Sequence, residues 1–331
     1  MAYHRLDRAN CDPRAGMEFA AGNRTYRLSG KIGDGAAGVV RKAIDRETGK
    51  VVAVKFLAPD PKYIDKNAFD DVEQRFRREG IRGSGLKHTN LVEIIAYEDN
   101  TRGSAFKSKA VENPFIVMEY VSGRTLESLI SNLEQRDNTN ATINGTTLSI
   151  ACRVADALRY LHERKIVHRD VKPANIFLSS TRIDTAPSIV KIGDFGVTKW
   201  GDFLAAAATG SLTLTFHQGL GTLKYMSPEQ SINPKEVTVR SDMFSFGITL
   251  FELFSGQILP SPHHIFQVMT ARQSRSTTIA KLHSLGVPCS YDEAMVFDLV
   301  LDMFLMGASG RPSSRKVLGT LEYFGERLAK S

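Results

Sequence analysis

The sequence is poor in cysteine and in long apolar runs, and each shortage excludes a class of protein. Only three cysteines occur among 331 residues, and Cys11, Cys152 and Cys289 stand far apart. An odd, widely spaced set argues against a disulfide or zinc framework and fits a reducing compartment. No run of eighteen apolar residues occurs, so no membrane-spanning helix is expected. The N-terminal stretch carries charges throughout and lacks the apolar core of a signal peptide, so we expect a cytoplasmic location.

The composition is that of a folded protein with a basic surface. Hydrophobic residues make up 42% of the chain and charged residues 24%, which suffices for two modest domains or lobes. The formal net charge of +7 is compatible with an anionic partner. No basic run with interleaved aromatics is longer than the cluster Arg75, Arg77 and Arg78. We therefore interpret the excess as a solvated surface and expect no nucleic-acid partner.

Three closely spaced glycines suggest a phosphate-binding turn. Gly33, Gly35 and Gly38 allow the backbone to approach phosphate oxygens where a Cβ would intrude. The same spacing occurs in dinucleotide-binding turns, but there a helix should follow. Here a β-rich segment follows at residues 39–44, and a second one at 51–57 contains Lys55. This continuation disfavours the dinucleotide interpretation.

A polar loop enclosed by apolar tripeptides carries the densest set of chemical groups. Residues 166–178 place Asp170, Lys172 and Asn175 within six positions, between two strand-like apolar segments. Buried strands at both ends would hold these groups in fixed geometry. Taken alone, the loop could equally be an exposed turn with scattered charges.

A second carboxylate, Asp194, follows a short apolar strand and stands between Gly193 and Phe195. A carboxylate in this position suits a hard cation held by oxygen, and no grouping of histidine and cysteine suggests a transition metal. A hydrolase that uses Asp170 and Asp194 as paired carboxylates is the alternative. That alternative leaves Lys55 and the glycine turn without a role.

Taken in order, these features resemble the eukaryotic-type (Hanks-type) serine/threonine protein kinases, of the bacterial kind, over residues 26–328. The matching elements are the glycine loop, Lys55, Glu79, Asp170, Asn175, Asp194, Ser227-Pro228-Glu229 and Arg311. The resemblance implies an α+β, bilobal fold with a small β-rich N-lobe, which carries one helix, and a larger, mainly helical C-lobe. We expect a flexible leader at 1–25, the N-lobe at 26–121 and the C-lobe at 122–331.

The resemblance also implies a role for each catalytic residue. Lys55, held by Glu79, would bind the α and β phosphates of ATP, and Asp170 would orient the substrate hydroxyl. Lys172 would stabilise the phosphoryl group in transfer, while Asn175 and Asp194 would bind Mg²⁺, with Mn²⁺ as the alternative ion. The ATP-binding set implied by the family is Ile32, Gly33, Gly35, Gly38, Val40, Ala53, Lys55, Met118, Glu119, Val121 and Phe177.

Substrate and regulation follow from the same resemblance. Lys172 and the pair Gly221-Thr222 indicate serine/threonine specificity on protein substrates. Because Arg169 resembles an arginine that a phosphorylated loop neutralises in relatives, Ser211, Thr213 and Thr215 are candidate autophosphorylation sites, with a transient homodimer. The resemblance further implies a buried ion pair between Glu229 and Arg311 and a backbone-holding role for Asp242.

One segment departs from the family pattern. Residues 69–80 are expected to form an amphipathic helix that carries Glu79, but Gly80, Gly83 and Gly85 crowd its end. Gly83 stands where the family usually has an apolar side chain. We therefore hypothesise a loose helix end, so that the Lys55–Glu79 pair needs outside help. This feature keeps a nucleotide-binding pseudokinase, acting as a scaffold, as the alternative function. A small-molecule kinase is a third possibility, which the segment from Gly221-Thr222 to Ser227-Pro228-Glu229 disfavours.

Overall fold

The computed structural model describes most of the chain. The described residues are 15–35, 38–58, 69–99, 113–134, 143–179, 187, 189–194, 224–233, 236–259, 275–284, 287, 289–305 and 307–330. They divide into two compact units. The first takes the described residues up to His88 and those from Val92 to Tyr120, and the second takes Thr89–Leu91 and those from Val121 onward. Each unit is described by itself.

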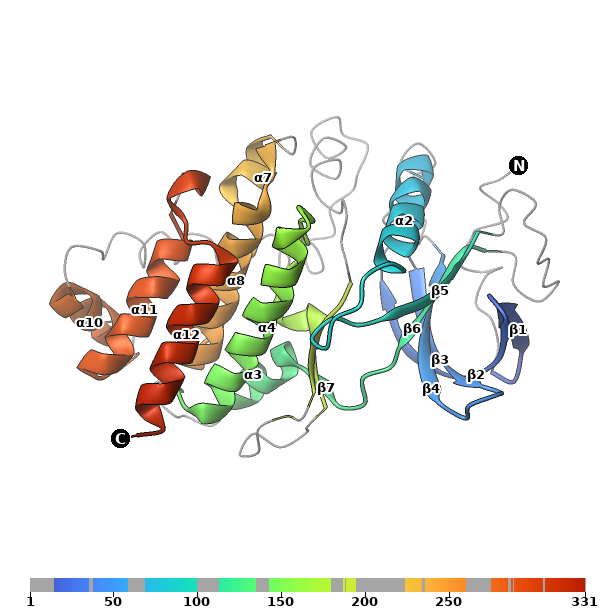
Figure 1. The fold of residues 1–331 in the computed structure, drawn as a ribbon, viewed down its shortest axis with the longest axis horizontal. Helices are drawn as coiled ribbons and strands as arrows, with labels where there is room; N and C mark the ends of the chain where they lie inside the picture. The colour runs from blue at the N-terminus through green and yellow to red at the C-terminus, as the bar shows by residue number, and fades with distance from the viewer. Residues whose placement is uncertain are drawn as a thin grey trace. The chain divides into compact units, whose positions relative to one another are not determined.

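The first unit is built on a six-stranded sheet in the order β1-β2-β3-β4-β6-β5, with every neighbouring pair antiparallel (Figure 1). The strands are β1 (Glu18–Ala21), β2 (Arg24–Gly35), β3 (Gly38–Asp45), β4 (Val51–Leu57), β5 (Ile94–Glu98) and β6 (Phe115–Glu119). Four aromatic rings, those of Phe19, Tyr26, Phe56 and Phe115, pack in its core. Helix α2 (Phe69–Gly83) packs against β5.

Strand β1 corrects one expectation. The sequence places residues 18–21 in a flexible leader, but they pair with β2 and bury Phe19 in the core. The ring of Phe19 lies 5.1 Å from that of Phe115 and 5.5 Å from that of Tyr26. One buried aromatic residue thus joins this short segment to the sheet, because burying a large apolar ring is favourable.

The second unit is mainly helical among its described residues. Its helices are α3 (Leu126–Glu134), α4 (Gly145–Glu163), α7 (Pro228–Ile232), α8 (Val239–Ser255), α10 (Arg275–Ser284), α11 (Tyr291–Met303) and α12 (Ser314–Leu328). Short 3₁₀ turns occur at η2 (Pro173–Asn175) and η4 (Ala308–Gly310). A small antiparallel sheet has the order β7 (Arg124–Thr125), β8 (Ile176–Leu178), β9 (Val190–Ile192). The α+β fold class inferred from the sequence is confirmed.

Helix α8 is the centre of the second unit, and its ends follow from local chemistry. The hydroxyl of Thr238 caps the first turn, and Gly256 ends the helix with a left-handed φ of 67°. Every residue from Ser241 to Ser255 is buried, as expected for a helix that is apolar on nearly all sides. It packs against α4 and α11. In the described part of the chain, no helix is both long and apolar enough to cross a membrane.

Candidate active site

The glycine turn joins β2 to β3, and its glycines serve different purposes. Gly35 pairs with Gly38, and Gly33 pairs with Val40 across the hairpin. A Cβ on Gly38 would overlap the carbonyl oxygen of Phe56 in β4, so only glycine fits there. Nothing lies within 4 Å of a Cβ built on Gly33, so the backbone there is open to a ligand. Packing within the sheet therefore explains Gly38 without any ligand.

Lys55 and Glu79 form a buried ion pair in the first unit. Lys55 Nζ donates to Glu79 Oε1 at 2.8 Å and to Oε2 at 3.1 Å. Each side chain is only 10% exposed. Removing either partner of such a pair is strongly destabilising, because the other is then left as an uncompensated buried charge. The position of α2 therefore determines the position of the Lys55 ammonium group.

The glycines of α2 are contact points with β5. A Cβ on Gly80 would lie within 2.5 Å of Tyr97 Cγ, and a Cβ on Gly83 would overlap Ile94 Cδ1. The helix continues through Gly80 to Gly83. The helix thus extends three residues beyond the end expected from the sequence, and the absent side chains allow α2 to approach β5 closely.

Two of the expected ATP-binding residues, Met118 and Glu119, lie at the end of β6, which pairs with β4 and β5. Met118 lies opposite Ala53 on one side and Ile94 on the other. The Glu119 N–H donates to the Glu93 carbonyl at 2.9 Å, so a ligand bond from Glu119 must use its carbonyl. Ala53 is buried, while Ile32 is 42% exposed.

In the second unit, Asp242 fixes the backbone of the polar loop, as the sequence implied. Its Oδ2 accepts the His168 N–H and its Oδ1 accepts the Arg169 N–H, both at 2.8 Å. His162 Nε2 also bonds Asp242 Oδ2 at 2.9 Å, and His162 Nδ1 lies 3.1 Å from Ser314 Oγ. Asp242 is 1% exposed, so these contacts are protected from water.

Asp170 is held on both carboxylate oxygens. Lys172 Nζ lies 3.0 Å from Oδ1, and Asn175 Nδ2 donates to Oδ2 at 2.9 Å. Asn175 Nδ2 also donates to the Asp170 carbonyl at 2.8 Å. Asp170 is buried to 4% exposure. The structure thus brings Asp170, Lys172 and Asn175 into one group with a fixed orientation.

Asp194 directly follows Gly193, whose backbone is bonded to this group. The Gly193 N–H donates to the Asn175 carbonyl at 3.0 Å, and Asp194 has a left-handed φ of 57°. Burial lowers the pKa of His168, while the charges of Asp242, Asp170 and Asp194 oppose that shift. Phe177, in β8, is half-buried opposite Thr125 and Lys191.

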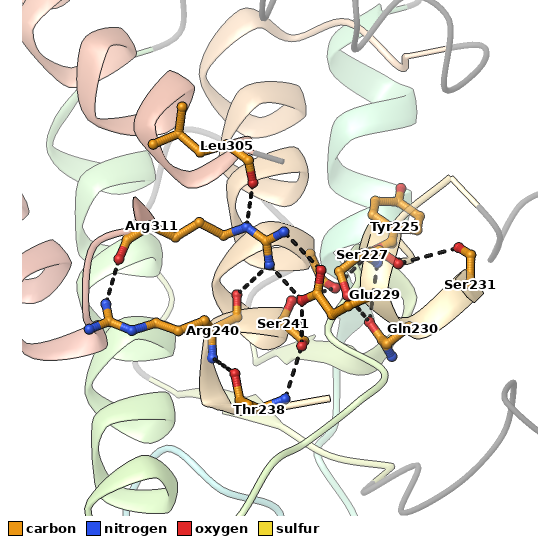
Figure 2. A network of polar contacts seen from close by, with 11 residues as sticks. Tyr225, Ser227, Glu229, Gln230, Ser231, Thr238, Arg240, Ser241, Leu305 and Arg311 are labelled. Carbon is orange, nitrogen blue, oxygen red and sulfur yellow. Dashed lines mark hydrogen bonds and ion pairs between the residues drawn. The ribbon is translucent and has the colours of Figure 1, made fainter. Parts of the chain in front are cut away.

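The expected pair between Glu229 and Arg311 is present as a bidentate bridge (Figure 2). Arg311 Nη1 lies 2.7 Å from Glu229 Oε1, and Nη2 lies 2.9 Å from Oε2. Ser241 Oγ adds a donor at 2.6 Å, and Arg311 Nε donates to the Leu305 carbonyl. Burial alone would raise the pKa of Glu229, but the hydrogen bonds from Arg311 and Ser241 lower it to about 2.

A second buried cluster, around Glu252 in α8, was not found from the sequence. Lys224 Nζ donates to Glu252 Oε1 at 2.6 Å, Tyr225 Oη donates to Oε2 at 2.6 Å, and the Leu259 N–H donates to Oε1 at 2.9 Å. Burial raises the pKa of Glu252, against the effect of Lys224 and Tyr225. The available signal was one carboxylate within the apolar run 248–254, which predicts a paired charge.

Several predicted residues lie outside the described part of the chain. They are the candidate phosphorylation sites Ser211, Thr213 and Thr215, together with Phe195, Gly221 and Thr222.

Comparison with known sequences gives a consistent result. The sequence model of the protein kinase domain matches residues 26–323. A probable serine/threonine-protein kinase PknB of Bifidobacterium longum is 36% identical over 247 residues, which are 73% of this chain and 31% of that protein. The serine/threonine-protein kinase PknB of Mycobacterium leprae is 34% identical over 236 residues, 70% of this chain and 32% of that protein. This chain thus spans about a third of the length of these relatives.

A solved structure agrees at the level of the fold. The crystal structure of the Mycobacterium tuberculosis PknI kinase domain matches with a TM-score of 0.60 and 21% identity. The match covers 95% of this chain and 99% of that one.

Proposed function

Because this chain belongs to the protein kinase domain family, we propose that it is a serine/threonine protein kinase, which transfers the γ-phosphoryl group of ATP to hydroxyl groups of proteins. Curated relatives named serine/threonine-protein kinases support this proposal. The observation that carries it is the group of Asp170, Lys172 and Asn175, in which both carboxylate oxygens of Asp170 have a partner.

Asp170 is the proposed base. A carboxylate fixed by two side chains can accept a hydrogen bond from a substrate hydroxyl and orient it for attack. Lys172, which contacts Asp170 Oδ1, brings a positive charge next to the base and would stabilise the phosphoryl group in transfer. In the first unit, Lys55 would bind the α and β phosphates, with Glu79 holding its ammonium group in place.

Asn175 and Asp194 suit a hard cation. The Asn175 amide nitrogen is engaged by Asp170, which leaves its Oδ1 as the ligand atom, and Asp194 adds a carboxylate. In the described part of the chain, no three His, Cys, Asp or Glu side chains gather as a metal site. An ion with so few protein ligands completes its shell with phosphate oxygens and water, which is typical of Mg²⁺. When bound, Mg²⁺ neutralises charge developing between the β and γ phosphates, and Mn²⁺ is the alternative.

The remaining ATP contacts are proposed residue by residue. In the first unit they are Ile32, Gly33, Gly35, Gly38, Val40, Ala53, Met118 and Glu119, and in the second unit Val121 and Phe177. A scaffold that only binds nucleotide is disfavoured, because all four of the following catalytic side chains are present. Lys55 bonds Glu79 within the first unit, and Asn175 bonds Asp170 within the second.

Autophosphorylation is part of the proposal. Ser211, Thr213 and Thr215 are the candidate acceptors, modified through a transient homodimer. Intact-mass measurement after incubation with ATP, repeated with Thr213 and Thr215 changed to alanine, tests this. The mass should rise in 80-Da steps per phosphate, about the mass of an added HPO₃ group, and fewer steps should appear in the double variant. An equal number of steps would reject both threonines.

Transfer of label from radioactive ATP with Mg²⁺ to a generic basic protein tests the proposed function. The wild-type chain should label serine or threonine, whereas Asp170→Asn should lower the rate by roughly 10²–10⁴-fold. Asp156→Asn, a half-exposed carboxylate on α4, is the matched control and should behave as wild type. No transfer by the wild type, or equal transfer by Asp170→Asn, would reject the proposal.

A further inference from the structure

Gln230 connects two segments of the second unit that lie far apart in sequence. Its Oε1 accepts the Ser227 hydroxyl at 3.0 Å and the Ser227 N–H at 3.2 Å. Figure 2 shows these two side chains facing each other at the start of α7. Its Nε2 donates to the carbonyl oxygen of Arg169 at 3.1 Å. The side chain is buried, so water is a poor substitute for these partners.

The Arg169 backbone has a conformation that its surroundings must maintain. Its φ of 68° lies in the left-handed region, which is unfavourable for a residue with a side chain. Such a residue keeps this conformation only where neighbouring groups determine it. Asp242 holds it on one side through the N–H groups of His168 and Arg169. Gln230 holds it on the other side through the carbonyl.

The peptide group held by Gln230 is the one that leads into Asp170. Because a peptide unit is planar, the direction of the Arg169 carbonyl fixes the direction of the Asp170 N–H. That N–H donates to His168 Nδ1 at 3.3 Å, a long hydrogen bond that constrains it weakly. The bond from Gln230 is shorter, and it acts on the same peptide plane from the opposite end.

We propose that Gln230 is a positioning residue for Asp170, and that it links the segment at the start of α7 to the polar loop. The proposal rests on the proposed function. Gln230 acts through the Arg169 carbonyl and makes no contact with the reacting atoms. A shift of residues 227–232 would therefore rotate the peptide before Asp170 and change the rate of transfer. Gln230 also borders a hollow beside Asp170 and Met226, so a contact with protein substrate is the competing role.

Two substitutions remove the bond to Arg169. Gln230→Glu keeps the oxygen that accepts from Ser227 but replaces the donor with a charged oxygen, and Gln230→Met removes the donor without adding charge but also removes the oxygen that Ser227 bonds. Gln74→Glu, on the exposed face of α2, is the control for the same chemical change. Rates are normalised to the folded fraction measured by circular dichroism, so that loss of folded protein does not count as loss of activity.

The expected result is a kcat about tenfold lower in both Gln230 variants, with the KM values for ATP and for protein within twofold of wild type. In an Asp170→Asn background the same substitutions should have no further effect, because the group being positioned is absent. Gln74→Glu should match wild type. An unchanged kcat, an equal loss in the Asp170→Asn background, or a rise in the protein KM alone would overturn the proposal.

Hydrogen exchange gives a readout that needs no activity. The backbone amides of residues 168–170 should exchange at least tenfold faster in Gln230→Glu, while those of β9 should not change. Equal exchange at 168–170 would overturn the proposal even if the enzyme is active. Faster exchange there, in a chain that transfers no phosphate, would uphold the link and reject only the proposed function.

Discussion

Tyr97 of β5 occupies the space that a side chain on Gly80 of α2 would need, with its Cγ within 2.5 Å of a Cβ built on that glycine. Gly80 follows directly after Glu79, whose carboxylate holds Lys55. The fit between a glycine and an aromatic ring therefore sets the distance between helix and sheet at the position where the ion pair forms.

Gly80→Ala should weaken both the fold and the ion pair. Replacing glycine by alanine inside a helix normally stabilises it by about 0.8–1 kcal/mol. A lower free energy of unfolding in Gly80→Ala would therefore identify the clash with Tyr97. We expect a loss of about 1–3 kcal/mol in the free energy of unfolding, together with a higher KM for ATP. Urea denaturation and steady-state kinetics measure the two effects.

Two other glycines are the controls for this prediction. Gly83→Ala should have a smaller effect than Gly80→Ala, because the atom it meets, Ile94 Cδ1, is the end of a flexible side chain. Gly85→Ala, with nothing nearer than 4.0 Å, should change stability by no more than about 0.5 kcal/mol. Equal behaviour of all three variants would contradict the role given to Tyr97.

Glu229→Gln should change the acid stability of the chain. Because the folded-state pKa of Glu229 is about 2 against an ordinary 4.5, its contribution to stability is complete above pH 4.5 and is lost as the pH falls toward 2. At pH 7 the free energy of unfolding of the variant should be about 3–5 kcal/mol lower, because the buried Arg311 then faces a neutral amide in place of a carboxylate. Urea denaturation at a series of pH values should show that the difference in unfolding free energy between wild type and variant becomes smaller below pH 4.5. A difference that does not depend on pH would refute the prediction.

His168→Gln should remove a different pH dependence. Burial lowers the folded-state pKa of His168 below its ordinary 6.5. Below about pH 6.5 the unfolded chain binds a proton at His168 more readily than the native chain does. The contribution of His168 to the free energy of unfolding is therefore fully present above about pH 6.5 and is lost as the pH falls below it. The variant should show a shallower decline between pH 7.5 and 5, whereas the exposed His283→Gln should decline as wild type does. Parallel curves for all three proteins would count against the assignment.

Lys224→Met should affect protein substrates more than ATP. The lysine contacts Glu252, which also accepts from Tyr225 Oη, so its loss leaves a buried carboxylate with fewer donors. Tyr225 is held further by Ser245, which donates to its carbonyl at 2.7 Å. Because Tyr225 lines the hollow beside Asp170, we expect a higher KM for protein with the KM for ATP unchanged, together with a loss of about 1.5–3 kcal/mol in the free energy of unfolding. Lys316→Met on the exposed side of α12 is the control, and a selective rise in the ATP KM would contradict the prediction.

Short motifs in the sequence predicted much of this arrangement, because Asp170, Lys172 and Asn175 are local and their spacing alone brings them together. The Glu229–Arg311 pair was predicted only through family resemblance, since 82 positions separate its members. Packing was the part that could not be predicted. Gly80 looked like a helix breaker because its partner Tyr97 belongs to another element. The segment around Phe19 looked like a leader because a strand of four residues leaves too short a pattern to detect.

The role proposed for Asp170 is tested by measuring ATP binding and phosphoryl transfer separately in Asp170→Asn. Calorimetry should give an ATP Kd within about threefold of wild type, because this carboxylate orients the hydroxyl and the phosphates are held by other groups. Single-turnover transfer to a serine- or threonine-containing protein should fall by roughly 10²–10⁴-fold. Wild-type transfer rates in the variant, or a loss of ATP binding as large as the loss of transfer, would contradict the account.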